Sequence, residues 1–189
     1  MQPNGRRALI VVDYQNDFVT GPMGFAKART LEQPIVEKIQ AAKQQGAEVL
    51  FTLDKHPPAR WQGQACQAPR HCIENTEGCA LYGAVARYLD RETPAFEKQT
   101  FGSLKLAKYL EERQFAKMEF VGVSTHLCVL SNAVLAQAAC PNARIFIDAR
   151  CVASPTNRDQ KRGLRAMQAL HIEVLAPKEQ NRWTEKTRP

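Results

Sequence analysis

The order of apolar runs and amphipathic segments predicts an α/β fold, with a mainly parallel sheet covered by helices on both faces. Short apolar runs, typical of buried strands, alternate along the chain with segments of helical periodicity. The chain has 189 residues, of which 44% are hydrophobic and 24% are charged. This composition suits one globular domain with a sizeable core, so we expect a single domain over residues 1–189.

The first part of the chain is predicted to contain a strand, a helix and a second strand. Continuous apolar runs predict strands at residues 8–12 and 48–53. Between them, apolar residues recur on one face of a helix at 31–45, which Gly46 ends. Residues 57–79 are rich in Gln, Pro and Cys and are expected to form a long irregular loop or lid.

The rest of the chain continues the alternation and ends in a tail. In chain order we expect a short helix at 84–90, a short strand at 95–97, a helix at 103–113, a strand at 118–122, a helix at 125–139, a strand at 144–148, a helix at 157–170 and a last strand at 172–175. The basic segment 176–189 is expected to be a C-terminal tail.

The charge balance and the apolar runs limit the classes of partner. The 26 Lys and Arg residues exceed the 19 Asp and Glu residues, but they are scattered, which favours a basic surface over a nucleic-acid site. No apolar run has the length of a membrane span or of a signal-peptide core. We therefore expect a cytoplasmic protein with reduced cysteines that binds neither nucleic acid nor membrane.

Reactive and polar residues follow the predicted strands. They are Asp13, Asp54, Lys98, Ser124 and Asp148. Because the carboxyl ends of parallel strands meet at one edge of a sheet, we expect these residues to gather at one rim.

Three of the residues near strand ends suit covalent catalysis. Cys128 lies at the start of a predicted helix, where free N–H groups and the helix dipole lower the pKa of a thiol. Asp13, with a pKa raised by burial, could accept the thiol proton, and Lys98 could offset the negative charge. Taken singly, the alternatives are a small buried cysteine, a turn-capping aspartate and a solvated lysine. Together the three residues indicate acyl transfer through a thioester.

Three stretches carry a resemblance to a known family. They are Val11-Val-Asp13-Tyr-Gln-Asn-Asp17-Phe18, Phe96-Glu-Lys98-Gln-Thr-Phe101 and Val121-Gly-Val-Ser-Thr-His-Leu-Cys128-Val129. With these motifs in this order, the chain resembles the isochorismatase-like cysteine hydrolases, which include the nicotinamidases, from about Ala8 to Leu175. The resemblance implies a three-layer Rossmann-like fold with a six-stranded sheet, and a homo-oligomer, dimer or tetramer.

The resemblance also implies roles for individual residues. Asp13, Lys98 and Cys128 would form a catalytic triad. A non-proline cis peptide would fall at Val123–Ser124, and the N–H groups of Ser124 and Cys128 would form an oxyanion hole. His126 stands where relatives usually carry an acidic residue, and is either a surface residue or a pocket residue that alters substrate preference.

A second group of residues resembles the metal-binding segments of nicotinamidases. Asp54, His56 and His71 match, and their donor atoms suit zinc, iron or manganese. At the place of a further histidine, the nearest substitute here is Gln62. Without a metal, Asp54 would cap a turn, His56 would bond to backbone and His71 would order the loop around Cys72. No organic cofactor is expected.

Three cysteines near this group, Cys66, Cys72 and Cys79, do not have the spacing of paired zinc motifs.

The sequence therefore predicts a nicotinamidase-related hydrolase that cleaves the C–N bond of a small amide. Phe18 and Phe101 are candidate pocket walls, with the core as the alternative place for Phe101, and Trp61 is a candidate lid residue. The alternatives are a vinyl ether hydrolase of the isochorismatase type, which the presence of Cys128 disfavours, and a non-catalytic binding member of the family.

Overall fold

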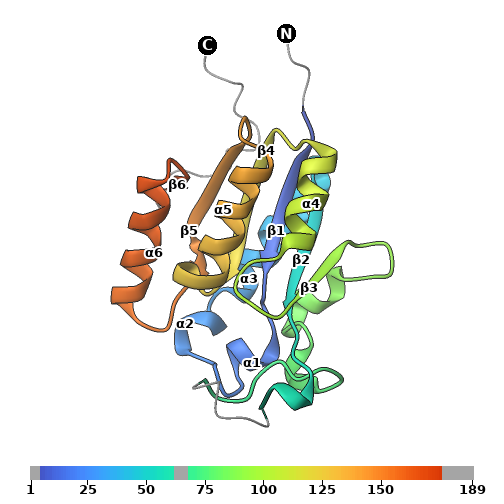
Figure 1. Cartoon of the computed structure of the whole chain (residues 1–189), viewed down its shortest axis with the longest axis vertical. Helices are drawn as coiled ribbons and strands as arrows, with labels where there is room; N and C mark the ends of the chain where they lie inside the picture. Colours follow the sequence, from blue (N-terminus) through green and yellow to red (C-terminus); the bar gives the residue numbers. More distant parts are fainter. Residues whose placement is uncertain (1–4, 62–67, 176–189) are drawn as a thin grey trace.

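Six parallel strands form one sheet in the order β3-β2-β1-β4-β5-β6 (Figure 1). This count covers residues 5–61 and 68–175, which are the residues that the computed structural model describes. The strands are β1 (Arg7–Val12), β2 (Glu48–Asp54), β3 (Ala95–Lys98), β4 (Lys117–Val123), β5 (Arg144–Ala153) and β6 (Glu173–Leu175). The predicted α/β class with a six-stranded sheet is confirmed.

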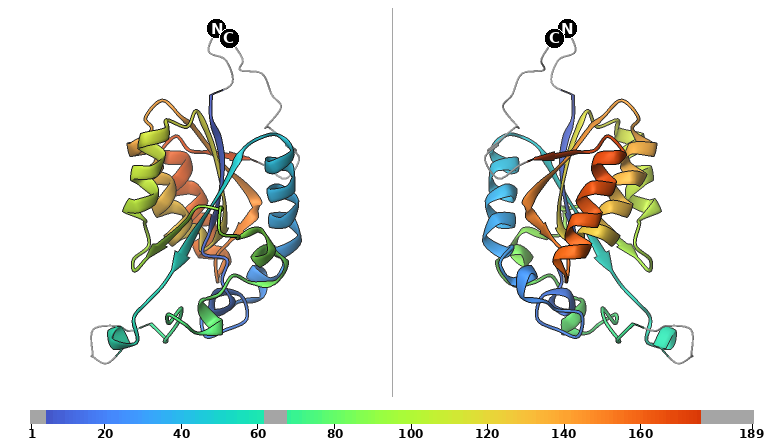
Figure 2. Two further views of the ribbon diagram at one scale, coloured as in Figure 1. Left: turned by 90° about the vertical axis from the view of Figure 1, so that its right-hand side faces the viewer. Right: turned by 90° about the vertical axis from the view of Figure 1, so that its left-hand side faces the viewer.

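Helices cover both faces of the sheet (Figure 2). Helix α3 (Glu32–Gln44) lies on one face. The helices α4 (Leu104–Arg113), α5 (Leu130–Ala139) and α6 (Asn157–Ala169) lie on the other. Two short helices, α1 (Asn16–Val19) and α2 (Ala26–Arg29), follow β1. None of the described helices combines the length and apolar character that a membrane crossing needs.

The alternation of side chains along β1 explains the three layers. Leu9 and Val11 pack in the core on the α3 side, whereas Ala8, Ile10 and Val12 pack against the helices of the opposite face. All five side chains are fully buried, which is typical of a central parallel strand covered on both sides. The chain passes from β3 at one edge to β4 beside β1, so the strand order reverses next to β1. Ligands of such sheets bind beyond the carboxyl ends of the strands at this point.

Several element boundaries differ from the prediction. The helix expected at 125–139 starts as a π-helical turn, Thr125–Val129, before α5 begins. The segment expected as a helix at 84–90 is a 3₁₀ helix, Gly83–Tyr88. In the expected loop 57–79, the described residues include two 3₁₀ turns, Pro58–Trp61 and Glu77–Cys79. Residues 62–67, with Gln62 and Cys66, and the tail 176–189 lie outside the described part of the chain.

Asp148 is not at the rim of the sheet, which corrects the sequence-based expectation. The strand β5 continues to Ala153 after a register shift against β4, so Asp148 lies inside it. Its carboxylate is 3.1 Å from the Nζ atom of Lys38, which is also 2.7 Å from Glu119. We call Lys38, Glu119 and Asp148 the core lysine cluster, and all three are buried.

The charges of the core lysine cluster hold one another ionised. Burial alone lowers the pKa of Lys38, but Glu119 and Asp148 outweigh it, and the pKa is raised. The pKa of Asp148 is lowered, because bonds from Arg150 and Lys38 outweigh its burial.

Candidate active site

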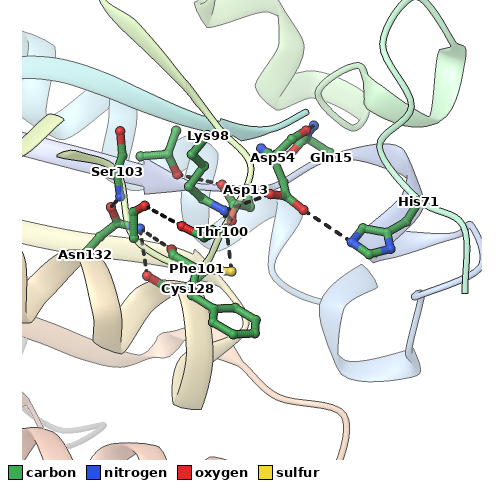
Figure 3. A network of polar contacts seen from close by, with 12 residues as sticks. Asp13, Gln15, Asp54, His71, Lys98, Thr100, Phe101, Ser103, Cys128 and Asn132 are labelled. Atoms are coloured by element: carbon green, nitrogen blue, oxygen red, sulfur yellow. Dashed lines mark hydrogen bonds and ion pairs between the residues drawn. The ribbon is translucent and has the colours of Figure 1, made fainter. Parts of the chain in front are cut away.

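Four side chains from different strand ends meet beyond the carboxyl edge of the sheet. Asp13 directly follows β1, Asp54 and Lys98 end β2 and β3, and Cys128 lies in the π-helical turn after β4. The Lys98 Nζ atom is 2.6 Å from Asp13 Oδ2, 3.2 Å from Asp54 Oδ1 and 3.7 Å from Cys128 Sγ. We call these four residues the site lysine cluster, and Figure 3 shows them pointing toward one another.

Asp13 is held in a conformation that suits a buried base. Its φ of 48° lies in the left-handed region, which costs a non-glycine residue about 1–3 kcal/mol. Its side chain is fully buried, and its Oδ1 accepts a 2.7 Å hydrogen bond from the Thr52 hydroxyl. Burial raises the pKa of Asp13 above its ordinary value, although the charge of Lys98 and the bond from Thr52 oppose the shift. Asp13 therefore accepts a proton more readily than an exposed aspartate.

The pKa of the Cys128 thiol is raised, whereas its place near a helix start alone would lower it. Burial, together with the charge of Asp13 and a hydrogen bond with it, raises the pKa of Cys128 well above its ordinary value, and the charge of Lys98 only partly opposes this. Cys128 as a whole is 7% exposed. Formation of a thiolate therefore calls for a proton acceptor nearby, and the Asp13 carboxylate lies next to the thiol.

Lys98 stays charged between these groups. Burial alone lowers the pKa of Lys98, but Asp13, Cys128 and Asp54 outweigh it, and the pKa lies above its ordinary value. The ammonium group can therefore balance negative charge on either the carboxylate or the sulfur.

The turn that carries Cys128 is packed closely on the sheet. The peptide bond Val123–Ser124 is cis, as the family resemblance implies. Gly122 has φ 114°, and a Cβ atom there would lie 2.1 Å from the carbonyl oxygen of Val12. Only glycine allows β4 to approach β1 this closely.

Helix α6 packs against the same turn on the side away from the sheet. The buried Thr125 hydroxyl donates a 2.7 Å hydrogen bond to Gln160 Oε1, and Gln160 Nε2 donates to the carbonyl of Val152. A Cβ atom on Gly163 would lie 2.8 Å from the Cα atom of His126. The missing side chain thus lets α6 contact the backbone of the turn, and the turn is fixed on two sides.

Asp54, His56 and His71 lie together, as the sequence predicts for metal ligands. Their ligand atoms all lie within 4.8 Å of one another. Asp54 Oδ2 is 2.8 Å from His56 Nε2 and 3.3 Å from His71 Nε2. One carboxylate and two imidazoles that face one point fit a divalent transition metal with open positions.

Other contacts of these three residues bear on the roles that they were expected to have if no metal is bound. The His56 ring contacts Asp54, while the backbone of His56 bonds to the carbonyl of Cys72 and to the N–H of Glu74. His71 Nδ1 donates to the carbonyl of Pro69, which does order the loop before Cys72. Burial alone raises the pKa of Asp54, but the bond with His71 and the charges of Lys98 and His56 outweigh it, and the pKa is lowered.

A cavity of about 390 Å³ opens above these groups. Cys128 and Ser124 contribute to its lining, as do Asp54, His56 and His71, which we call the Asp–His group. Phe18 and Phe101 are among its walls, and the Phe101 side chain is 54% exposed, so the alternative that placed it in the core is wrong. The side chain of Trp61, a candidate lid residue, lies outside what the structure describes.

His126 also lines the cavity and is half-buried, which agrees with the alternative that made it a pocket residue.

Two residues that hold the site in place were not identified from the sequence. The buried Gln15 accepts from the Asp54 N–H and donates to the Asp54 carbonyl, each at 2.8 Å. Asn132 donates to the carbonyls of Cys128 and Phe101 (Figure 3). Gln15 lies inside the first matching motif, but nothing in the sequence alone separates it from an exposed turn residue.

Comparison with known proteins decides the family. A family model for the isochorismatase domain matches residues 7–179. The chain belongs to this family.

Proteins similar to this chain include an uncharacterised isochorismatase family protein, PncA, of Bacillus subtilis. It is 30% identical over 161 residues, which cover 79% of this chain and 87% of the relative. A nicotinamidase of Acinetobacter baylyi is 26% identical, with 89% of this chain and 92% of the relative covered.

Solved structures of the family superpose closely on this one. A crystal structure of the nicotinamidase PncA of Bacillus subtilis has a TM-score of 0.80 and 28% identity, covering 90% of this chain and 99% of the other. The pyrazinamidase of Pyrococcus horikoshii, solved in complex with zinc, also has a TM-score of 0.80, with 25% identity and coverage of 90% and 98%.

Proposed function

We propose that this chain hydrolyses small amides through a covalent thioester on Cys128. At the level of the class, the prediction of a nicotinamidase-related amide hydrolase is confirmed by the family and by its nicotinamidase relatives. The observation that carries the proposed mechanism is the site lysine cluster, in which a thiol, a carboxylate and an ammonium group meet beside a cavity.

In the first half of the reaction, a proton moves from Cys128 to Asp13 as the sulfur attacks the amide carbonyl. The raised pKa of Asp13 suits this transfer, and Lys98 balances the charge that moves between the two groups. The backbone N–H groups of Ser124 and Cys128 would stabilise the tetrahedral oxyanion. The C–N bond then breaks, and the leaving nitrogen takes the proton from Asp13.

In the second half, water attacks the thioester and gives its proton to Asp13. The C–S bond breaks, the acid leaves, and the proton returns from Asp13 to the Cys128 sulfur. The atoms therefore balance over one turnover as amide plus water giving acid plus ammonia or amine. An intact Cys128 beside Asp13 disfavours the vinyl ether alternative and the non-catalytic alternative alike.

We also propose a divalent metal site at Asp54, His56 and His71, for zinc, iron or manganese. Bound there, the ion would act as a Lewis acid toward a basic atom of the substrate and so orient its amide. Asp54 would link this site to the reaction, because its other carboxylate oxygen is 3.2 Å from Lys98. In elemental analysis of the purified protein, we expect metal that falls after His56→Ala and stays after His171→Ala, an exposed histidine remote from the group. Equal metal content in both variants would contradict the site.

The central experiment compares Cys128→Ala with Cys140→Ala, a buried cysteine that bonds to the carbonyl of Leu110. We expect Cys128→Ala to abolish ammonia release from small amides such as nicotinamide while the protein stays folded, and Cys140→Ala to keep turnover. Mass spectrometry of the quenched wild-type reaction should detect an acyl group on Cys128. Full turnover by Cys128→Ala would end the covalent proposal.

We also propose that the protein acts in the cytoplasm and forms a homo-oligomer, either dimer or tetramer. The apolar side chain of Leu104 is 69% exposed and supports a contact between subunits. Light scattering of the purified chain tests this, and a monomer at micromolar concentration would contradict it.

A further inference from the structure

One wall of the cavity has no part in the proposed amide chemistry. It is formed by His126 of the π-helical turn and by Asp159 of α6, and we call it the α6 wall. The amide chemistry uses Cys128 and Asp13, and the metal proposal uses the Asp–His group on β2 and its following loop. The α6 wall is therefore free to contact a part of the substrate other than the scissile amide.

The His126 ring is held in a fixed orientation. Its Nδ1 atom is 2.8 Å from the hydroxyl of Ser154, which is 4% exposed. The backbone of His126 is pressed against Gly163 of α6. With Nδ1 engaged in this bond, Nε2 is the ring atom that remains for a ligand. A ring in a fixed orientation with one polar atom facing the ligand is typical of a residue that recognises a substrate group.

Asp159 gives the same wall a negative charge. Its carboxylate accepts a 2.6 Å hydrogen bond from the Thr156 hydroxyl, which lowers the pKa of Asp159. The Arg162 side chain is 3.9 Å away and 65% exposed, so it screens this charge weakly. None of the described residues that line the cavity is a lysine or an arginine. A carboxylate on the substrate would therefore meet repulsion here, whereas an N–H group would find an acceptor.

We propose that His126 and Asp159 select amides that carry a hydrogen-bond donor, an amine or a second amide, at the end remote from the scissile carbonyl. Amides with a carboxylate at that end are disfavoured. This inference rests on the proposed amidase function and names the substrate class of the same site. His126 contributes a polar ring atom, and Asp159 contributes the acceptor and the charge.

The test compares nicotinamide with its amino and carboxy derivatives, each as the set of ring isomers. For the wild-type enzyme we expect kcat/KM of the best amino isomer to exceed that of every carboxy isomer by roughly tenfold or more. Asp159→Asn keeps an acceptor for Thr156 but removes the charge, and should bring this ratio close to one. His126→Ala should lower kcat/KM for the amino isomer, with a smaller effect on nicotinamide itself.

The control is Arg165→Gln, an exposed position on the same helix, which should leave the ratio unchanged. A ratio that is the same in the wild type and in Asp159→Asn would overturn the proposal while leaving the amidase function intact.

Measurements of binding test the proposal independently of turnover. The same derivatives are titrated by calorimetry into Cys128→Ala and into the double variant Cys128→Ala, Asp159→Asn. Tighter binding of the amino isomer that disappears in the double variant supports the α6 wall. Equal affinities in both variants contradict it. Absence of turnover of every amide by the wild type would instead contradict the proposed amidase function.

Discussion

The molecule contains two buried lysine clusters on one sheet, and they differ in what lies beside them. In the core lysine cluster, Lys38 of α3 is buried against the middle of the sheet and contacts Glu119 and Asp148. In the site lysine cluster, Lys98 ends a strand and contacts two carboxylates and a thiol below a cavity. Both clusters bury charged groups, so burial alone does not distinguish them. They differ in position, because the site lysine cluster lies at the carboxyl ends of strands, where a ligand can approach.

The largest contrast should come from removing each lysine in turn. Lys98→Met should reduce turnover by about 10²–10³-fold, because it removes preorganised charge stabilisation. Lys38→Met should instead lower the free energy of unfolding by about 3–5 kcal/mol, because it removes the ammonium group that contacts the buried carboxylates of Glu119 and Asp148. Steady-state ammonia release and urea unfolding measure the two effects. If the folded fractions of both variants lose the same activity, the distinction between the clusters fails.

A second prediction concerns the packing of helix α6 against the turn that carries Cys128 of the site lysine cluster. Gly163→Ala should lower kcat by roughly tenfold or more, because the added methyl group pushes α6 off the turn that carries Cys128 and small misplacements of a nucleophile are costly. Helix propensity alone would make this change stabilising by about 1 kcal/mol. A matched control is Gly46→Ala, at φ 68° with open space around it. This variant should lose about 1 kcal/mol of stability with unchanged kcat.

A third prediction concerns the pH dependence of stability in the core lysine cluster. The pKa of Asp148 is lower in the folded protein than its ordinary value of 3.8, so its contribution is full above pH 3.8 and is lost as pH falls through the folded pKa. Asp148→Asn should therefore cost about 1.5–3 kcal/mol at pH 7. The difference from wild type should shrink toward zero in strong acid. Urea unfolding of both proteins at pH 7 and in strong acid checks this. A difference in the free energy of unfolding that does not change with pH would contradict it.

The smallest expected effect is a shift in the pH dependence of kcat/KM, which tests the role of Asp13 as the base. As the proton acceptor, Asp13 must be ionised, so kcat/KM should rise with pH through the raised pKa of Asp13. Thr52→Val removes a hydrogen bond that favours the ionised form. The acid limb of the profile should therefore move to higher pH, with the alkaline limb unchanged. A profile that does not move would argue against Asp13 as the base.

Much of this arrangement could be predicted from the sequence, because strand ends are recognisable. Apolar runs located β1, β2 and β4, and Asp13 and Asp54 therefore fell at the same edge. Asp148 was misplaced because β5 continues through polar residues after a register shift, which no apolar run reveals. The side chain of His126 could not be placed, because its direction depends on a π-helical turn rather than on ordinary helical periodicity.

The protonation state of Cys128 could not be predicted for a different reason. Position near a helix start favours a thiolate, but burial of the Cys128 thiol, together with the charge of Asp13 beside it, raises its pKa and has the opposite effect. The role of Gly163 was equally hidden, since a glycine within a helix gives no sign of which backbone it approaches.

Lys98 belongs to β3, a strand of four residues at the edge of the sheet, whereas Asp13 and Cys128 follow central strands. Edge strands open locally more readily than central ones, because they have neighbours on one side only. On warming, we therefore expect the Lys98 ammonium group to leave the site before Asp13 and Cys128 do. Catalytic competence should vanish at temperatures where spectroscopy still reports an intact interior, and cooling should restore it.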